Sequence, residues 1–336
     1  MTTPRLFSGM QPSADSLHFG NLAGALLQWV EMQNTHDAVF CVVDLHAITV
    51  PQDPATLAAT TRKTAAQFIA CGIDPRKSTV FVQSHVPAHS ELGWILNTVT
   101  SFGEASRMTQ FKDKTQKQGS DNATVGLFTY PILQAADILL YDATVVPVGE
   151  DQRQHIELTR NIAERFNQRF GDTFVVPEVK IIDAVAKIYD LQNPESKMSK
   201  SGESPQGILW LLDEPKTVAK KIKSAMTDSS SEIVFDIDRK PGVSNLLAIA
   251  SIATGKAVKV LEKEFQGLGY GDFKSSVAEA VVAFLEPIRN TTHELLADPA
   301  ELDRILAQGA EKAEVVAETM LGKVHSRLGL LGRTKR

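Results

Sequence analysis

The run Ala38-Val39-Phe40-Cys41-Val42-Val43 is a continuous apolar stretch with the length of a strand. A strand that is apolar at every position is typical of a parallel sheet with both faces covered by helices. A second such run, Thr-Val-Phe-Val, follows at residues 79–82. Around these runs, amphipathic stretches at 22–32, 54–71 and 90–99 predict helices. We therefore predict an α/β fold with a doubly wound, Rossmann-like parallel sheet.

A third apolar run, Val145-Val146-Pro147-Val148, leads into Gly149-Glu150-Asp151-Gln152. A helix of alternating charged and apolar spacing is predicted to follow and to end near Phe170. In doubly wound sheets, ligands bind at the carboxyl ends of the strands. The segment 149–152 is therefore expected to lie at a binding site.

The second part of the chain has a different pattern. From about residue 203 onward the stretches 215–226, 242–253, 257–264, 273–289 and 299–321 all predict helices, with one possible short strand at 233–235. Polar, loop-like composition at 115–124 suggests an excursion from the core. We predict a Rossmann-like domain at 1–202, with an inserted segment around 105–130, and an all-helical domain at 203–336.

Composition narrows the class of protein. The 336 residues carry a formal charge of −5 and are 43% hydrophobic, which excludes a uniformly basic surface for binding DNA or RNA. Cys41 and Cys71 show no metal-type or redox-type spacing, which fits a reducing, cytoplasmic setting. We see no apolar stretch long enough to span a membrane, so no membrane is expected as a partner. The negative net charge gives no reason to expect DNA as a partner.

Two short motifs carry the chemistry: His18-Phe19-Gly20-Asn21 and Lys197-Met198-Ser199-Lys200-Ser201. The first places a histidine and an asparagine three residues apart at a helix start, beside the exposed N–H groups of the first turn. The second places two lysines three apart among small and flexible neighbours, which suits a loop that closes over a triphosphate. Alone, the first motif is more often a helix cap and the second a solvated loop; together they predict one nucleotide site.

Further segments form an ordered series with these motifs. They are Phe7 to Ser13 (FSGMQPS), Asp44 to Thr49 (DLHAIT), Arg107 to Lys114 (RMTQFKDK), Thr129 to Pro131 (TYP), Ala135 to Asp137 (AAD) and Gly149 to Gln152 (GEDQ). With HFGN as a version of the HIGH signature and a complete KMSKS signature, the chain resembles the bacterial-type tryptophanyl-tRNA synthetases of class I over nearly its whole length.

The resemblance implies ATP-dependent activation of L-tryptophan to tryptophanyl-adenylate, followed by transfer to tRNA(Trp) with release of AMP and pyrophosphate. The attacking group is a carboxylate that is already ionised near neutral pH, so this step needs no protein base. The protein must instead align the reactants and place positive charge and N–H groups where negative charge develops. A site built from His, Asn, Lys and Gly residues fits that task better than a Ser-His-Asp set.

The resemblance also assigns residues to the phosphate and adenosine sites. Catalytic positions are His18, Asn21, Lys114, Lys197 and Lys200. Positions that bind ATP are Gln11, Pro12, Ser13, Gly20, Asn21, Gly149, Glu150, Asp151, Ile188, Lys197, Met198, Ser199, Lys200 and Ser201. Glycine is expected at position 20 because a side chain there would block the close approach of adenosine, and the acidic pair Glu150 and Asp151 suits ribose hydroxyls.

The tryptophan site follows from the same resemblance. A buried acceptor can recognise the single donor of the ring, the indole N–H, and Asp137 matches the family residue in that role. Tyr130 and Gln152 match positions that hold the ammonium and carboxylate groups, while Phe7 and His46 are expected to line the ring pocket. The chain departs from the family at Gln134, where many relatives carry methionine.

By resemblance, magnesium accompanies the triphosphate without a protein metal site, the helical domain binds the anticodon, and the protein is a homodimer. Three alternatives stay open from the sequence. A tyrosine-specific synthetase shares the core and both signatures, although DLHAIT, AADILLY and GEDQRQH favour tryptophan. The other two are a small-molecule adenylate-forming ligase, which the long helical domain disfavours, and an RNA-binding paralogue with a decayed site, which the intact His18, Lys197 and Lys200 disfavour.

Overall fold

The computed structural model describes residues 3–12, 16–108, 124–181, 187–200 and 204–332. Five parallel strands form one sheet in the order β3-β2-β1-β4-β5. The strands are β1 (Arg5–Met10), β2 (Asp37–Val42), β3 (Thr79–Val82), β4 (Val145–Val148) and β5 (Glu178–Ile181). The doubly wound sheet predicted from the apolar runs is confirmed, and β1 and β5 add two strands that the pattern did not single out.

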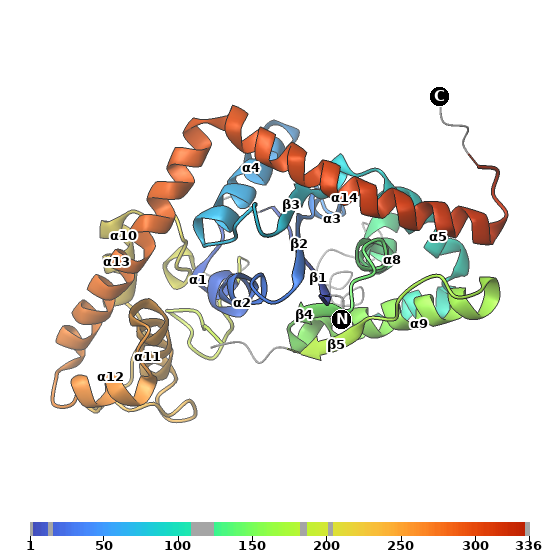
Figure 1. Cartoon of the computed structure of the whole chain (residues 1–336). Helices are drawn as coiled ribbons and strands as arrows, with labels where there is room; N and C mark the ends of the chain where they lie inside the picture. Colours follow the sequence, from blue (N-terminus) through green and yellow to red (C-terminus); the bar gives the residue numbers. More distant parts are fainter. Residues whose placement is uncertain (1–2, 13–15, 109–123, 182–186, 201–203, 333–336) are drawn as a thin grey trace.

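Helices cover both faces of this sheet (Figure 1). In the first part of the chain they are α1 (Phe19–Asn21), continued by a π-helical turn (Leu22–Leu26) and α2 (Leu27–Met32), then α3 (Asp44–Ala47), α4 (Pro54–Ala70), α5 (Ala88–Val99), α6 (Phe102–Ser106), α8 (Val125–Leu139) and α9 (Arg153–Phe170). Short 3-10 turns at Gln83–His85 and Glu150–Gln152 follow β3 and β4.

Local chemistry explains several of these boundaries. Strand β2 is buried at every position after its first residue, as its apolar run predicts. Helix α4 begins where the Asp53 carboxylate accepts a hydrogen bond from the N–H of Ala55 (3.0 Å), with Pro54 at the first helical position. Helix α9 ends at Gly171, whose φ of 93° is unfavourable for other residues.

The second part of the chain is helical. It contains a 3-10 turn (Pro205–Gly207), α10 (Pro215–Lys223), α11 (Pro241–Thr254), α12 (Val258–Glu264), α13 (Tyr270–Ala297) and α14 (Pro299–Leu328). The possible strand at 233–235 is wrong: this segment forms neither strand nor helix. One of its backbone groups bonds to a side chain rather than to a strand: the N–H of Phe235 donates to Glu262 Oε1 (2.6 Å).

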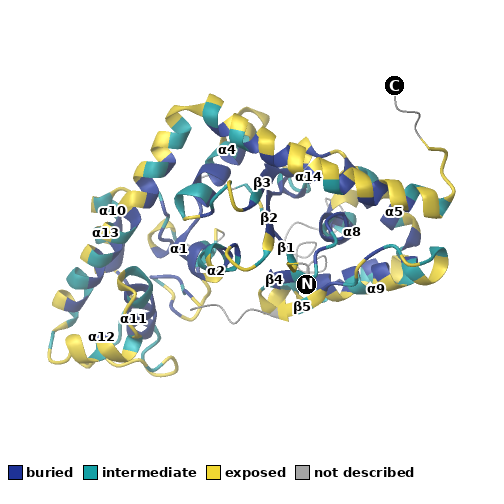
Figure 2. Cartoon of the chain, in the orientation of Figure 1, coloured by how far each residue is buried: buried dark blue, intermediate teal, exposed yellow. Residues whose placement is uncertain are grey.

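The last two helices pack on the first part of the chain. Helix α13 packs on α10, α11 and α4, and α14 crosses β3 and α5 (Figure 1). Helix α14 approaches so closely that a Cβ added at Gly309 would lie 1.8 Å from the Val80 carbonyl oxygen. Figure 2 shows the buried side of α14 turned toward the sheet. The boundary near residue 202 and the insertion around 105–130 stay predictions; residues 125–130 lie in α8, and 109–123 are outside the described residues.

Candidate active site

A cavity of about 390 Å³ opens at the carboxyl ends of β1 and β4. These two strands are neighbours in the sheet, and the chain winds outward from them in opposite directions, so the cavity lies at the topological switch point. Residues predicted for ATP and for tryptophan line it together: Gln11, Asn21, Gly149 and Asp151 with Phe7, His46, Tyr130, Asp137 and Gln152.

The two signature motifs face each other beside this cavity. A Cβ added at Gly20 would lie 3.6 Å from the main-chain oxygen of Met198 and 3.0 Å from His18 Nδ1. Burial, followed by the positive charges of Lys200 and Lys197, lowers the pKa of His18 to about 4. The imidazole is therefore neutral near neutral pH, and the two lysines are close enough to act on it.

His18 and Asn21 also form a reciprocal helix cap. The N–H of Asn21 donates to His18 Nδ1 (3.2 Å), and the N–H of His18 donates to Asn21 Oδ1 (3.0 Å). The capping role weighed from the sequence is thus present. It fixes both side chains at the start of α1, and Asn21 still lines the cavity.

The lysine motif is held by a short backbone ladder. Tyr189 pairs with Lys197 in an antiparallel bridge, and the N–H of Met198 donates to the carbonyl of Ile188 (3.0 Å). The side chains of Ile188 and Met198 are buried in the core that underlies α1 and α2. This anchoring holds the lysine motif beside the start of α1. The cavity wall itself includes Asn21 but not His18, Gly20, Ile188 or residues 197–200.

Asp137 is the most constrained carboxylate of the cavity and is only 1% exposed. Its Oδ2 lies 2.7 Å from His46 Nε2, and its Oδ1 lies 2.6 Å from His89 Nδ1 and accepts from Gln83 Nε2 at 2.7 Å. Burial raises the pKa of Asp137, but the two histidines outweigh it, so the net pKa lies well below the usual carboxyl range. The carboxylate is thus a buried, ionised acceptor in the wall of a cavity lined by both polar and apolar residues.

Gln83 and His89 were not identified from the sequence. Both are fully buried, and His89 Nε2 also lies 2.8 Å from the hydroxyl of Tyr141, whose ring stacks on Phe7 with centroids 5.6 Å apart. A polar residue at the end of β3 and another at the start of α5 carry no motif of their own. Each is followed in the sequence by a polar residue, Ser84 or Ser90, so nothing in the local pattern marks it as buried.

Other lining residues differ in how they are held. The hydroxyl of Tyr130 lies 3.0 Å from His155 Nε2, and burial raises the pKa of Tyr130 to about 12, so its hydroxyl stays protonated. Gln134 lines the cavity, as its position in the series suggested. An amide rather than a thioether therefore faces the space beside Asp137.

Not all predicted residues lie in the cavity wall. Glu150 instead pairs with Arg153 (Nε to Oε1 2.7 Å) on the exposed start of α9, and Pro12 is outside the lining. A Cβ added at Gly149 would lie 2.7 Å from Asp151 Oδ1, so a larger residue there would displace the Asp151 side chain. Ser13, Lys114 and Ser201 lie outside the described residues.

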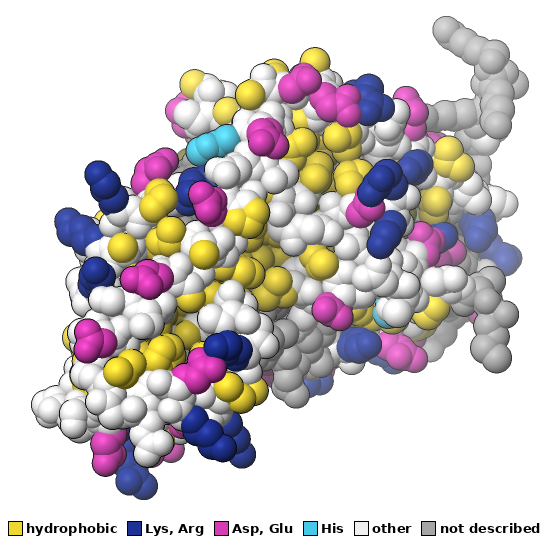
Figure 3. Space-filling model, turned by 60° about the vertical axis from the view of Figure 1, so that its left-hand side comes forward, with side chains coloured by type: hydrophobic (Ala, Val, Ile, Leu, Met, Phe, Trp, Pro, Cys, Tyr) yellow, Lys and Arg dark blue, Asp and Glu magenta, His cyan; other side chains and the backbone are white. Residues whose placement is uncertain are grey.

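A larger cavity of about 1170 Å³ lies between α2 and α11, and none of the predicted site residues lines it. Figure 3 brings the α10–α13 side forward and shows hydrophobic side chains gathered between charged ones on that face. Volume alone therefore does not identify the active site. Within the described ranges, no three His, Cys, Asp or Glu side chains are grouped to hold a metal ion.

Within the same ranges, no single helix is long and apolar enough to cross a membrane. The pair α11 and α12 meets that test only when taken together, and the chain bends by 105° between them.

Comparison with known proteins gives a consistent result. The sequence profile of the tRNA synthetases class I (W and Y) matches residues 2–286. A tryptophan–tRNA ligase of Leifsonia xyli subsp. xyli (strain CTCB07) is 62% identical over 334 residues, with 99% of each chain covered. The crystal structure of tryptophanyl-tRNA synthetase from Mycoplasma pneumoniae has a TM-score of 0.88 at 34% identity, covering 98% of this chain and 99% of that one.

A second solved structure, the tryptophanyl-tRNA synthetase from Campylobacter jejuni complexed with ADP and tryptophan, has a TM-score of 0.85 at 38% identity. It covers 97% of this chain and 100% of its own. The profile match includes both signature motifs.

Proposed function

The chain belongs to the bacterial-type tryptophan–tRNA ligases of the class I tRNA synthetases, and we propose that the cavity between β1 and β4 is the site of its reaction. It activates L-tryptophan with ATP to tryptophanyl-adenylate and transfers tryptophan to tRNA(Trp). The high identity to tryptophan-specific relatives decides against the three alternatives left open by the sequence.

Each step exchanges one bond for another. In activation, a tryptophan carboxylate oxygen bonds to the α-phosphorus of ATP, and the bond from that phosphorus to the bridging oxygen breaks to release pyrophosphate. In transfer, a hydroxyl oxygen of the terminal tRNA ribose bonds to the activated carbonyl carbon, the bond from that carbon to the phosphate oxygen breaks with its electrons going to AMP, and the hydroxyl proton passes to the departing phosphate. The first step requires alignment and charge stabilisation rather than a base.

We assign the phosphate region to the facing signatures. The single observation that carries this assignment is the close approach of the lysine motif to the start of α1, where a Cβ added at Gly20 would lie 3.6 Å from the main-chain oxygen of Met198. Negative charge moves onto the leaving pyrophosphate as its bond breaks, and the two ammonium groups stabilise it there. Neutral His18 adds no positive charge of its own and acts as a hydrogen-bonding group beside Gly20 and Asn21.

We assign tryptophan selection to Asp137. An ionised, buried acceptor that lacks its ligand donor carries a desolvation cost, on the order of 1–3 kcal/mol or more, which phenylalanine cannot remove. Tyr130 and Gln152, in the same cavity wall, hold the ammonium and carboxylate groups. Phe7 and His46 contact the ring.

The remaining ATP contacts are proposed from the positions of the residues around these two regions. Asp151 and Gly149 at the end of β4, with Gln11, Pro12 and Ser13 after β1, hold the ribose and adenosine, together with Ile188, Met198, Ser199 and Ser201. Glu150 reaches the ribose only by leaving Arg153, and Lys114 adds a third cation. Magnesium would arrive with the phosphates and would supply positive charge there without a dedicated protein site.

We propose that the helical part, residues 203–336, binds the tRNA anticodon, and that the enzyme is a cytoplasmic homodimer. Dimerisation is supported by three exposed apolar side chains, Trp94, Phe102 and Val125, which are 72%, 77% and 77% exposed. Helix α8, which carries Val125, packs on both α5 and α6, which carry the other two. A cytoplasmic location is supported by two cysteines that are both free thiols.

The decisive experiment measures tryptophan-dependent ATP–pyrophosphate exchange in the wild type and in Lys200→Ala. We expect Lys200→Ala to lower the exchange rate at least about tenfold while tryptophan binding, measured by calorimetry, changes less than about twofold, because the lysine acts on the transition state. Lys223→Ala, an exposed lysine of α10, is the matched control. Equal losses of rate and tryptophan affinity would contradict the assigned role.

A further inference from the structure

Asn245, a buried residue of α11, hydrogen-bonds both polar groups of one peptide residue outside its helix. Its Oδ1 accepts from the N–H of Tyr189 (2.9 Å), and its Nδ2 donates to the carbonyl of Tyr189 (2.9 Å). The two bonds mimic a strand partner, and among side chains of this length a primary amide alone offers both an acceptor and a donor in that geometry. Tyr189 is therefore held in place by a side chain from another part of the chain.

Tyr189 belongs to the backbone ladder that carries the lysine signature. It is bridged to Lys197, and on either side of it the N–H of Met198 donates to Ile188 (3.0 Å) and the N–H of Asp190 donates to Ser196 (2.9 Å). A shift of Tyr189 therefore shifts Lys197 and the residues that follow it. The hydrogen bonds of Asn245 to Tyr189 therefore constrain the backbone that carries the two lysines assigned to the phosphates.

Helix α11 is itself fixed on the same segment. A Cβ at Gly242 would lie 2.1 Å from the carbonyl oxygen of Met226, so the helix start presses against this residue. The N–H of Met226 in turn donates to the carbonyl of Leu191 (2.7 Å), two residues after Tyr189. Asn245 is therefore presented from a helix whose position relative to the ladder is set at a second point.

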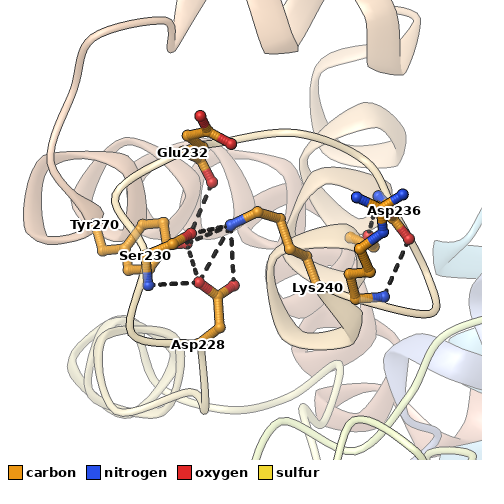
Figure 4. Close-up of polar contacts among 8 residues, drawn as sticks. Asp228, Ser230, Glu232, Asp236, Lys240 and Tyr270 are labelled. Carbon is orange, nitrogen blue, oxygen red and sulfur yellow. Dashed lines mark hydrogen bonds and ion pairs between the residues drawn. The ribbon is translucent and has the colours of Figure 1, made fainter.

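A polar cluster holds the start of α11 to the rest of the helical part. Lys240, the residue before Pro241, directs its Nζ to Asp228 (3.1 and 3.3 Å), to Ser230 and to the hydroxyl of Tyr270 (3.2 Å). The Tyr270 hydroxyl donates to Asp228 (2.8 Å), which ties the cluster to the first residue of α13 (Figure 4). The helix that carries Asn245 therefore has little freedom at this end.

From these contacts we propose that Asn245 is a positioning residue for pyrophosphate release, which holds Lys197 and Lys200 toward His18 through the backbone of Tyr189. The inference rests on the proposed roles of the two lysines. Asn245 touches neither substrate; it acts through the ladder. Its loss leaves the tryptophan pocket intact and misplaces the cations relative to the leaving group.

The experiment compares Asn245→Leu, which keeps the size of the side chain and removes both bonds, with Asn245→Asp, which keeps the acceptor and replaces the donor. Each is measured alone and combined with Lys200→Ala, with rates normalised to active sites by adenylate titration. We expect Asn245→Leu to lower the exchange rate by about tenfold to a hundredfold and to leave the dissociation constant of tryptophan within about twofold. If Asn245→Leu fails to fold, Asn245→Asp carries the test.

Ser244→Ala is the matched control, because Ser244 is the neighbouring buried residue of α11 and accepts from the N–H of Asp236 (2.8 Å) rather than from the ladder. It is expected to lower the melting temperature but to change the exchange rate by less than about twofold, since it does not reach the lysines.

The double variants separate positioning from mere stability. If Asn245 acts through Lys200, adding its substitution to Lys200→Ala costs clearly less than it costs in the wild type. Equal cost in both backgrounds, or an unchanged rate in both Asn245 variants, overturns the inference. If instead Lys200→Ala itself leaves the rate unchanged, the proposed role of that lysine fails, which is a different outcome.

Discussion

A Cβ placed on Gly20 would lie 3.6 Å from the main-chain oxygen of Met198, which brings the two signature motifs into contact distance across the active site. The motifs lie far apart in the chain, and the core beneath α1, α2 and the lysine ladder brings them together. A Cβ at position 20 would be in ordinary contact with Met198 but closer than that to the His18 ring, at 3.0 Å from Nδ1.

Substitution of that glycine therefore tests the nucleotide site. Gly20→Ala adds a methyl group 3.0 Å from His18 Nδ1 and is expected to lower the exchange rate by about tenfold or more at fixed ATP, with tryptophan binding retained. Gly126→Ala, where the nearest atom is 3.8 Å away, is the control. A wild-type response to ATP in Gly20→Ala would show that adenosine does not approach this residue.

The titration of His18 reports on the lysines directly. Its pKa is lowered from the ordinary value of 6.5 to about 4 by burial, then by Lys200 and Lys197. Lys200→Ala removes one positive charge and should raise this pKa, though not to its ordinary value, because burial remains the largest cause. Histidine-selective NMR titration measures both values, and an unchanged pKa in Lys200→Ala would place the lysine away from His18.

The same shift has a consequence for stability. Because the pKa of His18 is lower in the folded state, the unfolded chain takes up the proton first between pH 6.5 and about 4. The contribution of neutral His18 is therefore complete above pH 6.5 and is lost as the pH falls through this window. Chemical denaturation of wild type and His18→Gln over this range should show a smaller loss of unfolding free energy in the variant.

Asp137→Asn tests the recognition of the indole. The change replaces an ionised acceptor with an amide facing His46, His89 and Gln83. We expect kcat/KM for tryptophan to fall by roughly tenfold to a hundredfold, with a smaller fall for phenylalanine, because only tryptophan loses a donor–acceptor pair. Exchange assays with both amino acids measure this. The surface variant Asp303→Asn should change neither, and a parallel loss for both substrates in Asp137→Asn would indicate a structural role only.

Two glycines of α14 provide a matched test of its docking on the sheet. Gly309→Ala introduces a methyl group 1.8 Å from the Val80 carbonyl oxygen and is expected to lower the free energy of unfolding by about 1–3 kcal/mol. Gly322→Ala meets no atom within 4 Å and should raise it by about 0.5–1 kcal/mol, since alanine favours the helix. Urea denaturation distinguishes the two, and equal effects would contradict the close approach.

The exposed apolar side chains Trp94, Phe102 and Val125 predict the assembly state. Trp94→Arg replaces one of them with a charge and is expected to convert a dimer to monomers in sedimentation equilibrium. Val260→Arg on α12 changes an exposed valine of the helical part and should leave the mass unchanged. A wild-type protein that sediments as a monomer would refute the proposed dimer.

Much of the fold could be predicted because its signals are local. The apolar runs of β2, β3 and β4 and the periodicity of α4, α11 and α14 reflect burial on both faces or on one face, which neighbouring residues reveal. The segment at 233–235 shows the limit of such signals. Its β-branched and aromatic residues suit a strand, yet it pairs with no strand in the described part of the chain, and the N–H of Phe235 donates to Glu262 instead.

The order of the motifs along the chain was enough to predict the chemistry of the site: two lysines, a histidine near a glycine, and an aspartate after an alanine pair. The order does not indicate which side chains contact each other in the folded protein. The hydrogen bonds of Asp137 with His46, His89 and Gln83, and those of Asn245 with Tyr189, arise from packing between elements far apart in sequence. Such contacts depend on the relative placement of whole helices and strands, and burial makes their hydrogen bonds obligatory once that placement exists.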